Sequence, residues 1–104
     1  MITILARFKV QSGKETEAEQ AVRDMAAAVQ ANEPGAVTYL FHRSQRDPNE
    51  ITVFEVYADE SAFSTHGQTP HMAKLRSAFG QVFDPASVKI ERLERVAGFV
   101  RPAA

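Results

Sequence analysis

Two histidines, His66 and His71, lie in a stretch of the chain that is rich in aromatic and acidic side chains, residues 55–72. An imidazole has an ordinary pKa of about 6.5, so it can remove a phenolic or enolic proton near neutral pH. Gly67 and Thr69-Pro70 stand between the histidines and predict a break between two short helices. We therefore take His66 as the leading candidate for a general base and His71 as a second polar contact.

The residues around these histidines could form a cavity between a sheet and its helices. Small-molecule sites are typically apolar and contain one or two titratable groups with perturbed pKa values. The side chains expected to bind a substrate there are Tyr39, Phe54, Glu55, Tyr57, Phe63, Met72 and Phe79.

Simpler interpretations of the same residues compete with this one. His66 could pack against a neighbouring aromatic ring and donate to a backbone carbonyl, and His71 could be exposed in the first turn of its helix. We favour a structural ion pair over catalysis for Glu55, with Arg7 or Arg43 as its partner. The aromatic residues could simply form the core.

Composition excludes several classes of chemistry. The chain has no cysteine, which excludes disulfides, thiolate catalysis and cysteine-based metal sites. Its five glycines are isolated, so there is no phosphate-binding loop. The three histidines do not form a metal-binding motif, and we expect neither a metal nor a cofactor. With a net charge of -1 and scattered cations, nucleic acid is not an expected partner.

The sequence also lacks the features of a protein that is exported or inserted into a membrane. Residues 1–7 do not have the basic and apolar regions of a secretory signal. No apolar run approaches the ~20 residues that a membrane-spanning helix needs. We expect a cytoplasmic protein without a membrane partner.

Hydrophobic periodicity predicts the order of the elements. Residues 2–10, 37–42 and 51–57 alternate as strands, with a hairpin loop at 46–50 between the last two. Helical spacing predicts a long helix from Glu15 to the Glu33-Pro34-Gly35 stop.

The second half of the chain predicts a broken helix and a final strand. Asp59 is the expected cap of a short helix that ends at Gly67, and Thr69-Pro70 begins the next. A buried stripe extends that helix to Asp84-Pro85, with Met72, Leu75, Phe79 and Val82 as its members. The last strand is expected to begin near Val88 and to pass Arg95, with a bend at Gly98.

This order, β-α-β-β-α-β, predicts one α+β domain over residues 1–104 with a ferredoxin-like fold. Both helices would cover one face of a four-stranded antiparallel sheet. The other face would expose apolar side chains, namely Leu5, Tyr39 or Leu40, and Phe54 or Tyr57. Exposed apolar patches usually mark interfaces, so we expect a homodimer that buries this face. Residues 96–101 could reach across to the partner.

The chain resembles the antibiotic biosynthesis monooxygenase family, particularly its quinol-monooxygenase-like members, over residues 2–100. The resemblance rests on an ordered set of residues: Glu33-Pro34-Gly35, Glu55-x-Tyr57, Ser61-Ala62-Phe63, His66 and Thr69-Pro70-His71-Met72. It implies a dimeric α+β barrel that oxidises a quinol or related phenolic aromatic with dioxygen, without metal or flavin. A histidine base in a dry aromatic pocket would suffice for that chemistry.

Departures from the family pattern bear on which of the family's reactions we expect. Many relatives have tryptophan where Tyr57 stands. The haem-degrading branch has tryptophan in the place of His66 and asparagine on the first strand, where this chain has Ala6 and Arg7, which argues against haem degradation.

Two other functions stay open. One is an acid–base isomerase of a small polar metabolite, with Arg7, Arg43 or Lys74 as its anion site. The other is a non-catalytic dimeric binding module in which both histidines are structural. Fold alone does not decide among these functions.

Overall fold

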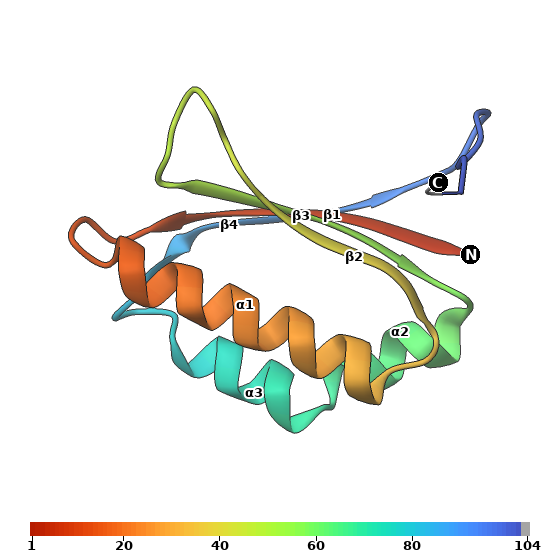
Figure 1. The fold of residues 1–104 in the computed structure, drawn as a ribbon, viewed down its shortest axis with the longest axis horizontal. Helices are drawn as coiled ribbons and strands as arrows, with labels where there is room; N and C mark the ends of the chain where they lie inside the picture. The colour runs from red at the N-terminus through yellow and green to blue at the C-terminus, as the bar shows by residue number, and fades with distance from the viewer. Residues whose placement is uncertain (103–104) are drawn as a thin grey trace.

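A four-stranded antiparallel sheet carries three helices on one of its faces (Figure 1). This computed structural model describes residues 1–102. The elements in chain order are β1 (Ile2–Val10), α1 (Glu15–Asn32), β2 (Ala36–Arg43), β3 (Glu50–Tyr57), α2 (Glu60–Gly67), α3 (Pro70–Ser77) and β4 (Phe83–Leu93). The strand order in the sheet is β2-β3-β1-β4, which confirms the predicted ferredoxin-like α+β fold.

Strand register decides which side chains face the helices. Ile4 of β1 pairs with Glu55 of β3, and Glu55 pairs in turn with Tyr39 of β2. Because side chains alternate along a strand, the even positions of β1 and the odd positions of β3 lie on the helix side. The buried cluster beneath the helices consists of Ala6, Phe8, Val10, Ala18, Val22, Met25, Val29, Ile51, Val53, Leu75 and Phe83.

Helix α1 contributes one apolar stripe to this core. Its buried residues, Ala18, Val22, Met25 and Val29, recur at intervals of three and four, as the 3.6-residue period requires. Acidic residues occupy its first turn, where the helix dipole favours them. The helix ends at Asn32, and Glu33 follows as its C-cap residue.

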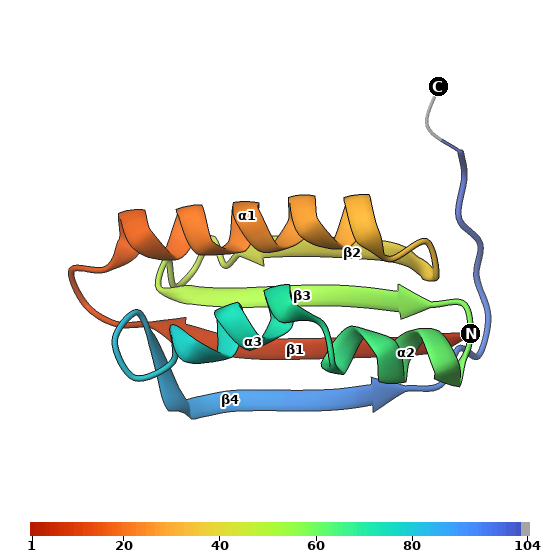
Figure 2. The same ribbon diagram turned by 90° about the horizontal axis from the view of Figure 1, so that it is seen from below.

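The predicted break between the two short helices is confirmed. Asp59 caps α2 by accepting from the backbone N–H of Ala62 at 2.8 Å. Thr69 caps α3 by accepting from the N–H of Met72 at 3.2 Å, and Pro70 stands at the first helical position. Helices α2 and α3 therefore follow one another across the sheet beside α1 (Figure 2).

The predicted boundary between the last helix and the last strand is wrong. Helix α3 ends at Ser77 rather than at Asp84-Pro85, and β4 already begins at Phe83 and ends at Leu93, before Arg95. Phe83 is fully buried and its ring lies 5.0 Å from that of Phe8, so burial of this aromatic side chain outweighs the local turn signal. Pro85 is tolerated because β4 is an edge strand.

The sheet face without helices is apolar at its centre. Leu5, Phe54 and Leu40 stand opposite one another on β1, β3 and β2, and Leu40 is 52% exposed. The register thus places Leu40 and Phe54 on this open face, and Tyr39 and Tyr57 on the helix side. The segment that follows β4 extends on the open-face side of the sheet (Figure 1). Three of its apolar residues, Val96, Phe99 and Val100, are exposed. No helix within residues 1–102 is long and apolar enough to cross a membrane.

Gly35 allows the start of β2 to approach α2 closely. A Cβ atom at this position would lie 2.6 Å from the Cβ of Ala62, well inside van der Waals contact. The backbone of Gly35 also accepts from the N–H of Ala58 at 2.9 Å, which fixes the strand beside the turn into α2. Glycine is therefore required here by space.

We predict that Gly35→Ala lowers the free energy of unfolding by about 1–3 kcal/mol, the usual cost of overpacking. Urea unfolding measures the change. The double variant with Ala62→Gly should lose less stability than the sum of the two single changes, because it removes the clash. Gly67→Ala is the control: it is helical, its new Cβ would come no closer than 3.9 Å to Arg76, and it should not destabilise. Strict additivity of the two changes would contradict this account.

Candidate active site

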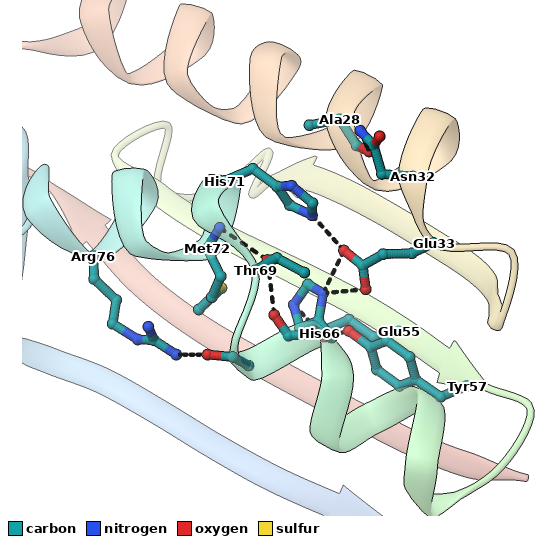
Figure 3. Close-up of polar contacts among 11 residues, drawn as sticks. Ala28, Asn32, Glu33, Glu55, Tyr57, His66, Thr69, His71, Met72 and Arg76 are labelled. Atoms are coloured by element: carbon teal, nitrogen blue, oxygen red, sulfur yellow. Dashed lines mark hydrogen bonds and ion pairs between the residues drawn. The ribbon is translucent and has the colours of Figure 1, made fainter.

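The carboxylate of Glu33 joins the two candidate histidines. It is buried at the C-terminal end of α1, and the Nδ1 atom of His66 lies 3.0 Å from one of its oxygens and 3.1 Å from the other. The Nε2 atom of His71 lies 2.5 Å from Oε2 of the same carboxylate (Figure 3). A carboxylate offers only acceptors, so each of these two nitrogens donates a hydrogen.

Sequence analysis treated Glu33 only as a helix stop and as part of a family motif. Its position contained a further signal, because a carboxylate at a helix C-terminus faces the negative end of the helix dipole. Such a residue, if buried, needs donors from elsewhere in the chain. The two histidines supply them. His66 does pack against aromatic rings, as the simpler interpretation expected, but it donates to a carboxylate rather than to a backbone carbonyl, and His71 is bonded to Glu33 rather than freely exposed.

A second buried carboxylate, Glu55, lies on the other side of His66. Its Oε1 atom is 3.9 Å from Nε2 of His66 and accepts a hydrogen bond from the hydroxyl of Tyr57. The expected ion pair with Arg7 or Arg43 is wrong. Arg7 points to the open face because it pairs with Thr52, and Arg43 binds Glu19 at 2.9 Å.

Burial sets the protonation of the groups around His66. The pKa of Glu55 is raised, first by burial and then by the charge of Glu33, against the opposing hydrogen bond from Tyr57. Burial likewise raises the pKa values of the Tyr39 and Tyr57 hydroxyls, and the charge of Glu55 adds to both. Both phenols therefore stay protonated at neutral pH.

His66 itself is held as a neutral imidazole. Burial lowers its pKa, while the charge and hydrogen bond of Glu33 act in the opposite direction. Its ring lies between those of Tyr39 and Tyr57, at centroid distances of 5.4 and 5.2 Å. With the Nδ1 hydrogen donated to Glu33, the lone pair is on Nε2, the side where Glu55 lies.

A cavity of about 550 Å³ lies between the sheet and the helices α2 and α3. Most of its wall is apolar. The lining residues are Ile4, Ala6, Phe8, Tyr39, Phe41, Val53, Glu55, Phe63, Ser64, His66, Gly67, Met72, Leu75, Arg76, Phe79, Pro85, Val88 and Ile90. A volume of this size suits one small organic molecule.

The predicted site residues divide into three groups. Six line the cavity, namely Tyr39, Glu55, Phe63, His66, Met72 and Phe79. Tyr57 stands one contact behind the wall, bonded to Glu55, and His71 stands two contacts behind it, bonded to Glu33, which in turn binds His66. The prediction that Phe54 binds substrate is wrong. Its side chain lies on the open face, because its neighbour Glu55 points to the helix side and side chains alternate along a strand.

The cavity has features that sequence analysis missed. Val88 and Ile90 of β4 form one edge of it, and Ile90 is 69% exposed, so the cavity is open toward the edge strand. Arg76 of α3 also lines it and donates to the carbonyl of Gly67 at 2.5 Å. Sequence analysis placed Val88 and Ile90 in the last strand and Arg76 in the last helix, but the patterns did not show that their side chains face the cavity. Within residues 1–102, no three His, Cys, Asp or Glu side chains are grouped so as to hold a metal ion.

The fold and the cavity define a class of ferredoxin-like α+β proteins, and comparison with known proteins identifies the family. The sequence profile of the antibiotic biosynthesis monooxygenase family matches residues 1–78. The chain therefore belongs to this family. A candidate antibiotic biosynthesis monooxygenase from Caulobacter crescentus is 35% identical, with a TM-score of 0.84 over 92% of this chain and 90% of that one.

Other similar proteins share the fold at lower identity. A Bacteroides thetaiotaomicron protein, also a candidate antibiotic biosynthesis monooxygenase, has a TM-score of 0.86 and 20% identity over 98% of this chain and 95% of that one. A Pseudomonas aeruginosa protein has a TM-score of 0.83 and 24% identity, with coverage of 92% and 94%. An uncharacterised Synechocystis protein is 29% identical over 63 residues, which are 60% of this chain and 43% of that protein. The match thus spans less than half the length of that relative.

We predict that Glu55→Gln stabilises the protein at pH 8 and does so less at pH 5. The pKa of Glu55 is raised in the folded protein, so its ionised carboxylate destabilises the fold at high pH. This free-energy cost disappears as the pH falls toward the pKa of Glu55 in the unfolded chain. Glutamine keeps an acceptor for Tyr57 without the charge. Thermal unfolding at both pH values measures the difference, with the exposed Glu17→Gln as control. Equal effects of Glu55→Gln on stability at the two pH values would contradict a raised pKa for Glu55.

Proposed function

We propose that the protein is a cofactor-independent monooxygenase that oxidises a quinol or related phenolic aromatic with dioxygen. One observation carries the proposal: an imidazole, fixed at Nδ1 by Glu33, stands in the wall of an apolar cavity that can hold one aromatic molecule. Family membership supports the reaction class. The choice of a quinol comes from the resemblance to quinol-monooxygenase-like members, and an imidazole beside an apolar cavity is compatible with it.

His66 would act first as the general base. Its Nε2 atom takes the proton of a phenolic hydroxyl, and the imidazolium that forms is stabilised by the adjacent Glu33 carboxylate. The phenolate is electron-rich and reduces dioxygen directly. One oxygen atom forms a bond to the ring carbon, whose C–H bond breaks, and the other leaves as water. All four electrons come from the organic substrate, so a quinol and O2 give a hydroxyquinone and water.

The remaining cavity residues would hold the aromatic ring and exclude water. Phe63, Met72 and Phe79 present apolar surface, and Tyr39 presents a ring beside His66. An apolar enclosure strengthens the interaction between the imidazolium and the phenolate because little water screens it. Dioxygen is apolar as well and enters such a cavity without a desolvation cost.

The isomerase alternative has less support at this cavity. The cations proposed for its anion site, Arg7, Arg43 and Lys74, are not among the residues that line it. Arg76 does line it, and its guanidinium already donates to the Gly67 carbonyl. A thermal-shift panel of phosphorylated small molecules separates the two functions. Stabilisation by these compounds, and not by quinones, would favour the isomerase.

We predict that the protein increases dioxygen uptake by reduced menadione above the protein-free rate. When the reaction is run under ¹⁸O₂, each molecule of the hydroxynaphthoquinone product should contain one ¹⁸O atom. His66→Ala should lower the rate by about a hundredfold or more, the usual contribution of a general base.

The control is His42→Ala, because His42 is an exposed histidine away from the cavity. It should retain the native rate. No protein-dependent uptake, or full activity in His66→Ala, would contradict the proposal. Formation of unlabelled menadione and hydrogen peroxide would identify an oxidase rather than a monooxygenase.

The open sheet face supports a second part of the proposal, a homodimer. Leu5, Leu40 and Phe54 form an apolar row on the sheet face that no helix covers within residues 1–102, and the segment after β4 extends on the same side (Figure 1). A second copy that docks its own open face would bury both rows. Phe99 and Val100 follow β4 and are exposed, and we expect them to contact that copy.

We predict that Leu40→Lys converts a dimer into a monomer, because the partner face would have to bury a charge. Size-exclusion chromatography with light scattering measures the mass. Ile90→Lys is the matched control, since Ile90 is even more exposed but lies on the helix side of the sheet. A native monomer would contradict the homodimer, and a dimer that survives Leu40→Lys and is lost in Ile90→Lys would show that another surface is used.

A further inference from the structure

Two hydrogen-bond acceptors in the cavity wall have no donor of their own. Nε2 of His66 and Oε2 of Glu55 make no hydrogen bond within residues 1–102, although the two side chains are only 6% and 9% exposed (Figure 3). Every fully buried side-chain nitrogen and oxygen in that part of the chain has a partner. These two atoms are therefore in contact with the space of the cavity, which both residues line.

Contacts on the far side of each group leave these two acceptors for a ligand. Glu33 takes the hydrogen on Nδ1 of His66, so the lone pair of that ring is on Nε2. The hydroxyl of Tyr57 donates to Oε1 of Glu55, so Oε2 is the oxygen that remains. Nε2 and Oε1 are 3.9 Å apart, which is too far for a hydrogen bond between the imidazole and the carboxylate.

A ligand that fills this cavity has to supply a donor to each acceptor. An aromatic molecule displaces water from the wall, and a buried acceptor that is left without a donor weakens binding. Because His66 and Glu55 stand next to each other, the two donors must stand on neighbouring atoms of the ligand. Adjacent hydroxyls on an aromatic ring have this arrangement, whereas the hydroxyls of a 1,4-quinol lie on opposite sides of the ring.

We propose that the cavity selects an aromatic 1,2-diol, with one hydroxyl donating to Nε2 of His66 and its neighbour donating to Oε2 of Glu55. This inference rests on the proposed function and specifies its substrate class. Glu55 is then a specificity-determining residue, and Tyr57 positions its carboxylate. The reaction keeps its balance, because the diol and O2 give a hydroxyquinone and water, with all four electrons from the diol.

The rest of the wall favours an aromatic diol over a sugar-like one. A sugar-like diol would meet the same two acceptors, but its other hydroxyls would lie against Phe63, Met72 and Phe79 without partners. A flat aromatic ring places only apolar carbon there. The diol group and the ring thus match different parts of one cavity.

Anaerobic titration calorimetry at pH 8, where both acceptors are expected to be unprotonated, tests the preference without turnover. The probes are 2,3-dihydroxynaphthalene with adjacent hydroxyls, 2,6-dihydroxynaphthalene with distant hydroxyls, and 2-naphthol with a single hydroxyl. The native protein should bind the first probe at least about tenfold more tightly than the other two, because these leave one buried acceptor unpaired. Equal affinities, or tighter binding of the 2,6 isomer, would overturn the inference.

Glu55→Gln tests whether the carboxylate is the source of the preference. Tyr57 needs an acceptor, so the amide oxygen should face its hydroxyl, and the amide NH2 group, which only donates, should face the cavity. The variant should bind all three probes with similar affinity and should bind 2-naphthol as the native protein does. The exposed Glu17→Gln is the matched control and should keep the native preference. A preference that persists in Glu55→Gln would overturn the role of Glu55.

Binding and oxygen uptake can fail independently, so the two proposals are separable. A preference for 2,3-dihydroxynaphthalene in a protein that oxidises neither diols nor quinols would support selection of a 1,2-diol and reject the proposed oxygenation. Oxidation of reduced menadione by a protein without this preference would support the oxygenation and overturn selection of a 1,2-diol.

Discussion

A carboxylate that is buried at the C-terminal end of a helix must be given hydrogen-bond donors, and Glu33 obtains two of them from imidazoles that belong to different helices. This requirement explains why α2 and α3 are separate. A continuous helix would turn His66 and His71, five residues apart, to opposite faces. The break at Gln68, with Thr69 as the new cap, lets both rings converge on one carboxylate.

The convergence of the two histidines on Glu33 also depends on the close contact between Gly35 and Ala62. Glu33 lies two residues before Gly35, and Gly35 touches Ala62 of the helix that bears His66. A larger residue at position 35 would push α2 away from the end of α1 and lengthen the contact between His66 and Glu33. The space around Gly35 and the geometry of the histidine cluster are thus parts of one constraint.

Most of the fold could be predicted because it depends on local patterns. Alternation in β1 and β3, helical spacing in α1, and the caps Asp59 and Thr69 each act over a few residues. The end of α3 could not be predicted in this way. Phe83 enters the sheet because it packs on Phe8, more than seventy residues away in the chain, and no local signal reports that contact. The later start predicted for β4 also hid Pro85 as part of the cavity wall.

Prediction of the site had a similar limit. The two histidines were found by residue type and position, but Glu33, which orients them, is separated from His66 by 33 residues and meets it only through space. The error at Phe54 could have been avoided, since a strand that points Glu55 toward the helices must point Phe54 away. The preference for a structural ion pair at Glu55 failed for the same reason, because Arg7 lies on the opposite face of β1.

An imidazole between two buried carboxylates has two different neighbours, and the difference matters for any reaction in this cavity. On the Nε2 side, Glu55 has a raised pKa and a buried phenol as its partner, so that side tends to stay neutral and dry. On the Nδ1 side, Glu33 connects to a histidine that reaches the surface. The side of His66 that would take a substrate proton is thus the apolar one, and the opposite side holds the carboxylate that would stabilise the imidazolium. The fold supplies the two carboxylates from the end of α1 and from β3.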